Sequence, residues 1–421
     1  MDRVPTLGRM AEAHVRTITD DELPAYVDVV RTSFVDGPAT SDEVEARRPL
    51  TDISRSLGAF DESGRLCGGA RAFGTPLTVP GGATLPTAAV TSVGVLPTHT
   101  RRGHLTRLMQ AQLADVADRG EPLAALIAAE YPVYGRYGYG PATEAVTLRL
   151  DSTAAAWRDD PVGTVELVDA ETWAKLIDEL YDRVRTTVAG HIAWETVLWR
   201  VQAGLDPSPW GHDDKAGKAR RVVWRDAGGE VQGATAYTVD GSWTRNRPAG
   251  TLTADVLVST TDRAEHELLR YLASIDWASQ VDVWLRPVDD PAPLALTDGR
   301  AAVLADRSDH LWVRVIDVPA ALSARTYATA GSLVLEVADP AGFAAGRFRL
   351  EAGPDGATCA ATGDDADLTV AVGALGAAYL GGIGWGRLAA AGWVDEHTAG
   401  AVARAATLFT TPRAPWCPRT F

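Results

Sequence analysis

The spacing of apolar residues changes along the chain, and each change predicts a different element. Residues 55–96 alternate short apolar runs with turn sequences such as DESG and VPGG, which predicts an antiparallel meander. Residues 103–118 carry apolar side chains at helical spacing, and the apolar run PLAALIAAE that follows is typical of a central strand. Ahead of the meander, the pattern predicts a short strand near His14 and a helix that begins after Thr19 and ends near Phe34.

The same order of elements recurs in the middle of the chain. A hairpin pair, RRVVWRDAGGEVQGATAYTVDGSW, precedes GTLTADVLVSTTDRAEHELLRYLASI, which again reads as strand, turn and helix. Beyond a proline-rich linker, GSLVLEVAD, GRFRLEAG, ATCAATG and DLTVAVGAL predict strands, and two helical segments follow that end near Phe409. A length of 421 residues favours about three domains. We therefore predict a mixed α+β and α/β protein with domains at 1–148, 149–298 and 299–421.

One stretch, VTSVGVLPTHTRRGHLTRLMQ from Val90 to Gln110, predicts an anion-binding turn. A buried strand breaks at Pro97, and the basic turn that follows leads into the helix. Backbone N–H groups at that turn have no helical partner, Gly103 leaves room for an anion, and the helix dipole adds partial positive charge. A phosphate would fit there, with an ordinary solvated turn as the alternative. GxGxxG is absent from this turn and GxxxxGK[ST] from the whole chain, which argues against a dinucleotide fingerprint or a P-loop.

The equivalent turn of the repeat, STTDRAEHE, has different chemistry. It has no glycine and no paired arginine, and it carries several carboxylates, so a pyrophosphate would meet like charge. The second domain is therefore predicted to bind no phosphate and to form a wall of the substrate cavity instead.

Composition and charge narrow the function. The net charge of −15 argues against nucleic acid or an anionic membrane as the main partner and suits a cationic small molecule. Three distant cysteines, Cys67, Cys359 and Cys417, form no CxxC pair, so we predict no metal site and no redox disulfide. With no signal-like apolar region after the first charges and no run long enough for a membrane helix, we expect a cytoplasmic protein with a loose leader at residues 1–14.

The Val-x-Val-x-Pro run followed by Arg-Arg-Gly resembles the acetyl-CoA signature of the GNAT superfamily of N-acetyltransferases. The resemblance implies a strand edge that pairs with the pantetheine arm and a turn that cradles the pyrophosphate. The strand-edge residues would be Val93, Gly94 and Val95, and the turn residues Arg101, Arg102, Gly103 and His104. The chain departs from the family pattern at Thr100 and Leu105, where the superfamily prefers Arg or Gln and Gly or Ala, so the phosphate loop is expected to be slightly remodelled.

A second motif, EYPVYGRYGYGPAT at residues 130–143, places three glycines among four tyrosines directly after a buried strand, an arrangement that can aim a phenol at a ligand. Together with LTVPGG, LPTAAV, PTHTRRG and SFVD, it closely resembles the Eis ("enhanced intracellular survival") family, whose members acetylate aminoglycoside antibiotics. By that resemblance, Tyr134 is the general acid that protonates the departing CoA thiolate. The resemblance also implies a degenerate second GNAT-like domain, a third domain with a sterol-carrier-protein-like fold, and a homohexamer.

The carboxyl terminus, TTPRAPWCPRTF, holds prolines at positions 412, 415 and 418 and cannot form a helix. On residues alone, a frayed terminus is the simpler interpretation. The Eis resemblance instead makes the α-carboxylate of Phe421 the base that takes a proton from the acceptor amine. Because an α-carboxyl group has an unperturbed pKa of about 3.3 to 3.7, an apolar site would have to raise that pKa. Thr420 stands where relatives can have an acidic residue.

In a GNAT domain, the region after the first helix roofs the acceptor pocket. We predict substrate contacts from Phe34, Asp36, Ser92 and Glu130, with Asp42 and Glu43 as further carboxylates near Asp36 that could receive amines or simply face solvent. The leading hypothesis is an acetyl-CoA-dependent aminoglycoside N-acetyltransferase that acts at several amines. One alternative is acetylation of protein lysine, a polyamine or an arylalkylamine, and another is a non-enzymatic binder of lipid or small molecules.

Overall fold

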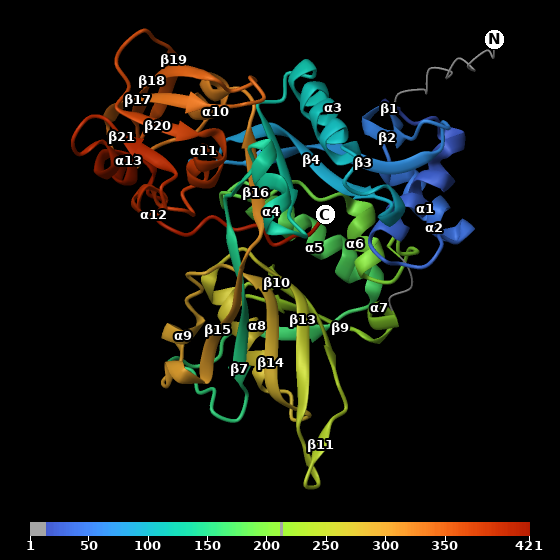
Figure 1. The fold of residues 1–421 in the computed structure, drawn as a ribbon. Helices are drawn as coiled ribbons and strands as arrows, with labels where there is room; N and C mark the ends of the chain where they lie inside the picture. Colours follow the sequence, from blue (N-terminus) through green and yellow to red (C-terminus); the bar gives the residue numbers. More distant parts are fainter. Residues whose placement is uncertain (1–13, 211–213) are drawn as a thin grey trace, which may run out of the picture.

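The computed structural model describes residues 14–210 and 214–421, so the predicted leader lies, apart from His14, outside the described residues. Two seven-stranded sheets, one five-stranded sheet and a two-stranded ribbon make up its β-structure. Figure 1 shows the second sheet below the first, with the third sheet beside the first. This arrangement confirms the predicted mixed α/β architecture. None of the described helices combines the length and apolar composition needed to span a membrane.

The first sheet has the strand order β1-β2-β3-β4-β5-β16-β6. Its strands are β1 (His14–Thr17), β2 (Ser56–Phe60), β3 (Leu66–Thr78), β4 (Thr84–Val95), β5 (Leu123–Ile127), β16 (Leu311–Val315) and β6 (Gly140–Pro141). Its helices are α1 (Leu23–Ser33), α2 (Ser41–Arg47), α3 (His104–Asp118) and α4 (Tyr131–Tyr134). The predicted meander, first helix and central strand are therefore present.

Helices α1 and α3 cover opposite faces of the first sheet, as neighbouring glycines of β3 show. A Cβ added at Gly68 would meet Leu108 of α3, whereas one added at Gly69 would lie 2.5 Å from the ring of Tyr26 on α1. Successive residues of a strand point to opposite faces, so the two helices pack on different sides. The carboxyl end of β4 consequently lies between the start of α3 and the end of α1.

The second sheet has the order β15-β7-β14-β13-β10-β9-β8. Its strands are β7 (Glu144–Asp151), β8 (Thr164–Leu167), β9 (Arg220–Arg225), β10 (Val231–Val239), β13 (Gly250–Ser259), β14 (Ala278–Arg286) and β15 (Ala302–Asp309), with the ribbon β11 (Trp243–Thr244) and β12 (Arg247–Pro248). Its helices are α5 (Ala170–Val184), α6 (Thr196–Gln202), α7 (Asp214–Lys218), α8 (Asp262–Ala273) and α9 (Ala292–Ala295). The order β8-β9-β10-β13-β14 repeats β1-β2-β3-β4-β5, as the internal repeat predicted.

The two repeats are joined by strands that cross between them. Strand β7 follows the first repeat but pairs with β14 and β15, and β16 follows the second repeat but pairs with β5 and β6. The predicted boundaries at residues 148 and 298 differ from this pairing, because the first cuts β7 and the second assigns β15 and β16 to the third domain. The predicted proline-rich linker likewise runs into paired strands.

The third sheet has the order β19-β18-β17-β20-β21. Its strands are β17 (Gly331–Ala338), β18 (Gly346–Gly353), β19 (Gly356–Ala361), β20 (Leu368–Ala371) and β21 (Val394–Glu396), and its helices are α10 (Val318–Ala324), α11 (Val372–Tyr379), α12 (Trp385–Ala390) and α13 (Ala401–Phe409). After α13 the chain runs without helix or strand to its end. Figure 1 places that carboxyl terminus at the centre of the molecule, beside α5 and α6.

Candidate active site

Strands β4 and β5 separate at their carboxyl ends. They pair in parallel only from Thr87–Ala89 to Leu123–Ala125, although β4 continues to Val95. A shift in the register between β3 and β4 accompanies the separation, and Ser92 has a left-handed φ of 54° at this irregularity. The backbone of Val93–Val95 is therefore unpaired on its β5 side and can pair with a bound ligand.

The end of α1 lies against this open strand edge. A Cβ added at Gly94 would lie 1.9 Å from Ser33 Oγ, so only glycine permits this approach. The next residue, Phe34, is the C-cap of α1, is 50% exposed, and lies within 4 Å of the same added Cβ. The structure thus brings Phe34, Ser92 and Gly94, three predicted site residues, to one place.

The turn between β4 and α3 has the features of an anion cradle. Gly103 is the N-cap of α3 with a left-handed φ of 81°, and a Cβ there would meet only Arg107 among the nearby groups, at 3.4 Å. Arg101 and Arg102 are exposed, and the first turn of α3 contains no acidic residue. Arg107 Nη2 donates to Arg102 O at 3.2 Å, which fixes the turn. The residues present therefore fit a pyrophosphate.

His104 contributes to this cradle differently from Arg101 and Arg102. Its side chain is 4% exposed, and its ring nitrogens lie 3.7 and 3.8 Å from Cys67 Sγ in the core. Burial, followed by the charge of Arg107, lowers the pKa of His104, so the ring is neutral at physiological pH. Only the backbone N–H of His104 is available to a phosphate.

Tyr134 ends the short helix α4 and packs in the same core cluster as Val90 and Val93 of β4. It is 8% exposed, and its ring contacts Tyr139 edge to face at a centroid distance of 6.2 Å. Burial, followed by the negative charge of Glu130, raises the pKa of Tyr134 to about 12. The phenol is therefore protonated and can donate a proton beside the open end of β4. Glu130 is exposed at the N-cap of α4, where it acts on Tyr134 through its charge.

The last residue reaches the first sheet. Phe421 contacts Phe73 of β3 edge to face, with ring centroids 5.6 Å apart. It lines a cavity of about 150 Å³ together with Thr91 of β4, next to the irregular Ser92.

A larger cavity of about 660 Å³ shares Trp194, Leu198 and Trp210 with the small one. These two cavities, which we call the acceptor cavities, share a wall and extend from Thr91 of β4 to the second domain.

The walls of the acceptor cavities combine carboxylates and indole rings. Asp42 and Glu43 line the larger cavity, as do several residues that sequence reasoning missed: Asp206, Trp210, Asp255, Trp284 and Arg419. By contrast, Asp36 is exposed on the loop after α1 and lines neither cavity, so the prediction that it contacts substrate has no support from this arrangement. No local motif marks the missed residues, since they come together only through tertiary packing.

The corresponding turn of the second repeat is closed by its own side chains. The hydroxyl of Thr261 caps α8 by accepting from Ala264 N at 3.1 Å, and the first helical turn carries Asp262 and Glu265. Glu265 pairs with Arg286 of β14 at 2.5 Å. A phosphate would find capped N–H groups and two carboxylates here, as the sequence predicted.

Comparison with known families agrees with this geometry. A family described as "Acetyltransferase (GNAT) domain" matches residues 14–142, and a second family with the same description matches residues 190–315. A third family, described as "Sterol carrier protein domain", matches residues 318–418. These matches confirm two GNAT-like domains and a third domain of the sterol-carrier fold. They also make the chain an acyltransferase with an acyl-CoA cosubstrate.

Several full-length relatives share this organisation. An N-acetyltransferase of Streptomyces avermitilis is 42% identical over 99% of this chain and 100% of its own length. N-acetyltransferase Eis of Mycobacterium tuberculosis is 34% identical over 89% of this chain and 90% of its own length. The crystal structure of Eis1 from Mycobacterium abscessus superposes with a TM-score of 0.84 and 35% identity, covering 97% of this chain and all of that chain. The chain therefore belongs to the Eis family of GNAT N-acetyltransferases.

Proposed function

We propose that the protein transfers an acetyl group from acetyl-CoA to amines of aminoglycosides, at more than one position of the acceptor. The observation that carries this proposal is the meeting of Phe421 and Thr91 in one cavity. We infer that the terminal carboxylate reaches the neighbouring strand edge, where a thioester would pair. Acetyl-CoA would supply the acyl thioester and a thiolate leaving group. The chain supplies the orientation and the proton transfers.

Each of the groups has one task. Backbone N–H groups at Val93–Val95 pair with the pantetheine arm and polarise the thioester carbonyl, while Arg101, Arg102 and the N-terminus of α3 hold the pyrophosphate. The neutral amine attacks the carbonyl carbon and forms the C–N bond. The α-carboxylate of Phe421 accepts the proton that the amine loses, and Tyr134 donates its proton to the sulfur as the C–S bond breaks.

The acceptor cavities support a polycationic substrate with several rings. Asp42, Asp206 and Asp255 line the larger cavity, where Asp206 already pairs with Arg200 at 2.8 Å. The faces of Trp194 and Trp210 add apolar surface and can make cation–π contacts. A cavity of about 660 Å³ can admit an aminoglycoside in more than one orientation. Such freedom would bring more than one amine to the thioester.

The test of the acceptor is thiol release from acetyl-CoA by the purified protein. We expect turnover with kanamycin or neomycin that exceeds turnover with spermidine or a lysine peptide at equal concentration by about tenfold in kcat/KM, because only the larger polycation fills both acceptor cavities. Higher kcat/KM on the polyamine or peptide would move the assignment to that acceptor, which is the second candidate. If the protein bound acetyl-CoA but acetylated none of these amines, it would be assigned as a non-enzymatic small-molecule binder.

The cosubstrate turn can be tested separately. Arg101→Gln and Arg102→Gln are each expected to raise the Kd for acetyl-CoA, measured by calorimetry, about five- to tenfold because each removes a charge-assisted contact to phosphate. Arg119→Gln is the matched control, since Arg119 lies after the other end of α3 and pairs with Asp115 at 2.8 Å. An unchanged Kd in both turn variants would place the pyrophosphate elsewhere.

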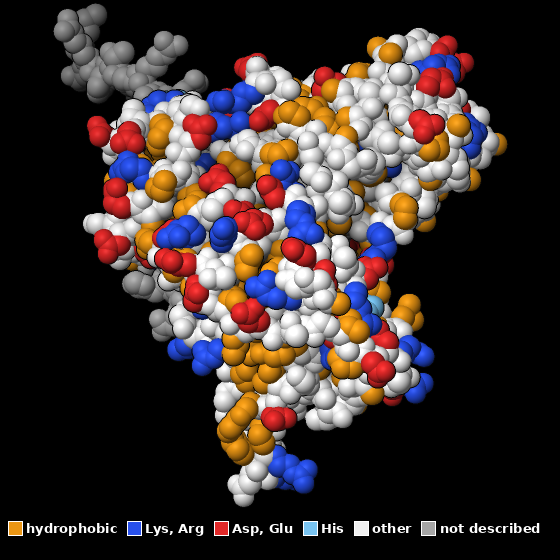
Figure 2. Space-filling view, turned by 180° about the vertical axis from the view of Figure 1, so that it is seen from behind, with side chains coloured by type: hydrophobic (Ala, Val, Ile, Leu, Met, Phe, Trp, Pro, Cys, Tyr) orange, Lys and Arg blue, Asp and Glu red, His pale blue; other side chains and the backbone are white. Residues whose placement is uncertain are grey.

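The proposed partners are a cationic amine and further copies of this chain, assembled as a homohexamer by analogy with the Eis family. The second domain supports self-association through an exposed apolar end. Trp243 and Trp277 are 54% and 57% exposed and contact each other at 5.3 Å between ring centroids. Figure 2 shows hydrophobic side chains gathered toward this narrow end of the molecule. Exposed patches of this kind commonly mark subunit contacts.

A further inference from the structure

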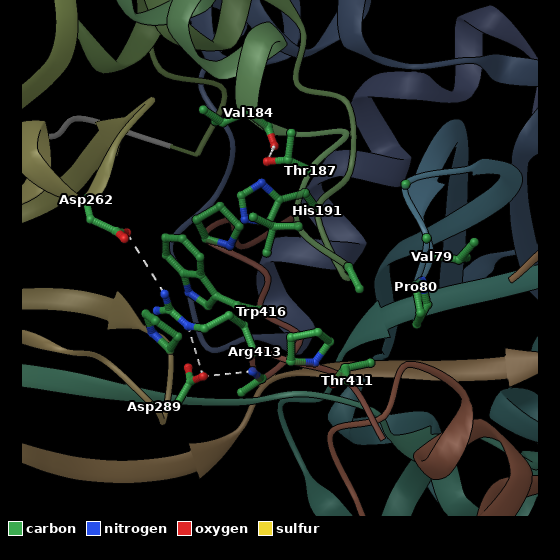
Figure 3. A pocket seen from close by; sticks show the side chains of 18 of the residues that line it. Val79, Pro80, Val184, Thr187, His191, Asp262, Asp289, Thr411, Arg413 and Trp416 are labelled. Carbon is green, nitrogen blue, oxygen red and sulfur yellow. Dashed lines mark hydrogen bonds and ion pairs between the residues drawn. The ribbon is translucent and has the colours of Figure 1, made fainter. Parts of the chain in front are cut away.

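Residues 410–421, which we call the tail, are held by side chains of the second domain. The carboxylate of Asp289 accepts from Arg413 Nε at 3.1 Å and from the backbone N–H of Ala414 at 2.9 Å. Asp262, at the start of α8, lies 4.0 Å from Arg413 Nη1. Figure 3 shows these contacts in the wall of a cavity of about 710 Å³. Asp289, which follows β14, and Asp262, at the start of α8, thus form the first anchor of the tail.

Trp416 continues this anchor. Its backbone N–H donates to Ala189 O at 2.8 Å, and its indole N–H donates to Leu285 O at the end of β14. Its ring lies edge-on to the imidazole of His191 at 5.1 Å, and the guanidinium of Arg286 lies 5.3 Å from the ring centroid. Figure 3 shows Trp416 and His191 side by side. The carboxyl end of β14, the counterpart of β5 in the first repeat, therefore binds the tail.

Arg419 forms a second and unusual anchor two residues before the terminus. It is 5% exposed, and its guanidinium lies 3.8 Å from the ring centroid of Trp199 and 5.2 Å from that of Trp194. Tyr181 of α5 completes this aromatic cage at 5.4 Å. Nη1 donates to Gln202 Oε1 at 3.1 Å.

The backbone at Arg419 is fixed as firmly as its side chain. Its carbonyl accepts from His310 Nε2 at 2.9 Å and from Cys417 Sγ at 3.4 Å. Burial lowers the pKa of Arg419 to about 10, so the side chain remains a cation at neutral pH. A buried cation held by aromatic faces and one amide is costly to a fold, and its retention calls for a functional reason.

We propose that the second domain, having no cosubstrate site of its own, serves as the dock that positions the catalytic tail, and that Arg419 in its aromatic cage is the positioning residue for the Phe421 carboxylate. The inference rests on the proposed function, because it takes that carboxylate as the base. Extended chain spans at most about 3.6 Å per residue, so fixing Arg419 confines the carboxylate to a small volume beside β4. A planar guanidinium suits the cage because it stacks on ring faces, which an ammonium does less well.

The test compares Arg419→Met, which keeps the length and removes the charge, with Arg419→Lys, which keeps the charge. Arg183→Met is the matched control, since Arg183 lies on α5, the helix of Tyr181, but donates on the surface to Gln232 at 2.9 Å. The first measurement is the rate at which carboxypeptidase A releases Phe421 from each folded protein, well below its Tm. The second is kcat and KM for acetyl-CoA.

We expect Arg419→Met to release Phe421 at least about tenfold faster than wild type and to lose about 100-fold in kcat, with KM for acetyl-CoA within about twofold, because a misplaced base slows chemistry without touching the cosubstrate site. Arg419→Lys should lie between, and Arg183→Met should match wild type in both measurements. Unchanged release in Arg419→Met would overturn the proposed dock. Unchanged kcat despite faster release would overturn the positioning role.

The two measurements also separate this inference from the function on which it rests. Release of Phe421 by the peptidase requires no acetyl transfer, so faster release in the Arg419 variants of an enzyme that acetylates no amine would uphold the dock and refute the proposed function. A change in KM for acetyl-CoA together with kcat would indicate general damage to the fold and would count against a specific positioning role.

Discussion

Tyr134→Phe is expected to lower kcat for acetyl transfer by about 100- to 10,000-fold while leaving the Kd for acetyl-CoA nearly unchanged. The substitution removes one oxygen and keeps the buried ring that packs against Tyr139. Without the hydroxyl, the sulfur must leave as an unprotonated thiolate, because its proton donor has been removed. Thiol release with an aminoglycoside acceptor measures kcat, and calorimetry measures the affinity for acetyl-CoA.

The raised pKa of Tyr134 adds a pH dependence to this prediction. Burial raises that pKa to about 12, so the phenol keeps its proton throughout the range in which the protein can be assayed. Ionisation of Tyr134 should therefore cause no fall in kcat between pH 7 and about pH 10. A proton donor with a strongly lowered pKa would instead produce an alkaline limb within that range, and such a limb would speak against Tyr134 as the acid.

Tyr137→Phe is the matched control for Tyr134→Phe. Tyr137 lies in the same turn, is also 8% exposed, and shares a hydrogen bond of 3.3 Å with Thr106 Oγ1. Its loss should change Tm slightly and kcat by less than about threefold. Equal losses of kcat in both variants would mean that the turn responds as a packed unit, and the specific role of Tyr134 would be withdrawn.

The parts of the site that the sequence predicted well are those coded by neighbouring residues. Helix α3 begins at His104, one residue after the predicted start, with Gly103 as its N-cap at a left-handed φ of 81°. The turn before it carries the two predicted arginines, both exposed. Thr19 and Glu22 form a capping box at a 3-10 turn, Asp20–Glu22, which leads directly into α1 at Leu23. Such signals act within a few residues, so they survive whatever the rest of the chain does.

Features that depend on distant pairing could not be predicted in this way. The crossing of β7 and β16 between the two sheets joins residues more than a hundred positions apart, and nothing in either strand records its partner. The run DLTVAVGAL, predicted as one strand, ends as β20 at Ala371 and continues as α11. Nearly every residue of α11 is buried, so the run lacks the polar positions that distinguish a helical period from a strand.

The walls of the acceptor cavities could not be predicted either, because they also depend on contacts between distant residues. Trp194 and Trp210 come from the second domain, and Phe421 comes from the chain end, yet they enclose one space with Thr91. Tryptophan in a core and tryptophan in a ligand site look alike in a sequence. Likewise, Arg419 reads as an ordinary surface cation until its burial against Trp199 is seen.

A short extension after Phe421, such as Gly-Ser, is expected to lower kcat with an aminoglycoside by at least about 100-fold. The extension leaves every side chain in place, including the Phe421 ring that meets Phe73 at 5.6 Å, but it converts the α-carboxylate into a peptide group that cannot accept a proton. The new carboxylate lies two residues further on, outside the position that the tail fixes. The same dipeptide added at the amino terminus should leave kcat unchanged.

The extension separates a catalytic carboxylate from an apolar plug more sharply than a truncation does. Deleting Phe421 would remove both the ring and the position of the charge, so a loss of activity could come from either. If the extended protein keeps its Tm and its affinity for acetyl-CoA but loses kcat, the loss belongs to the carboxylate itself. If instead the extended protein turns over as wild type does, the base is another group, and Phe421 only closes the wall of the acceptor cavities.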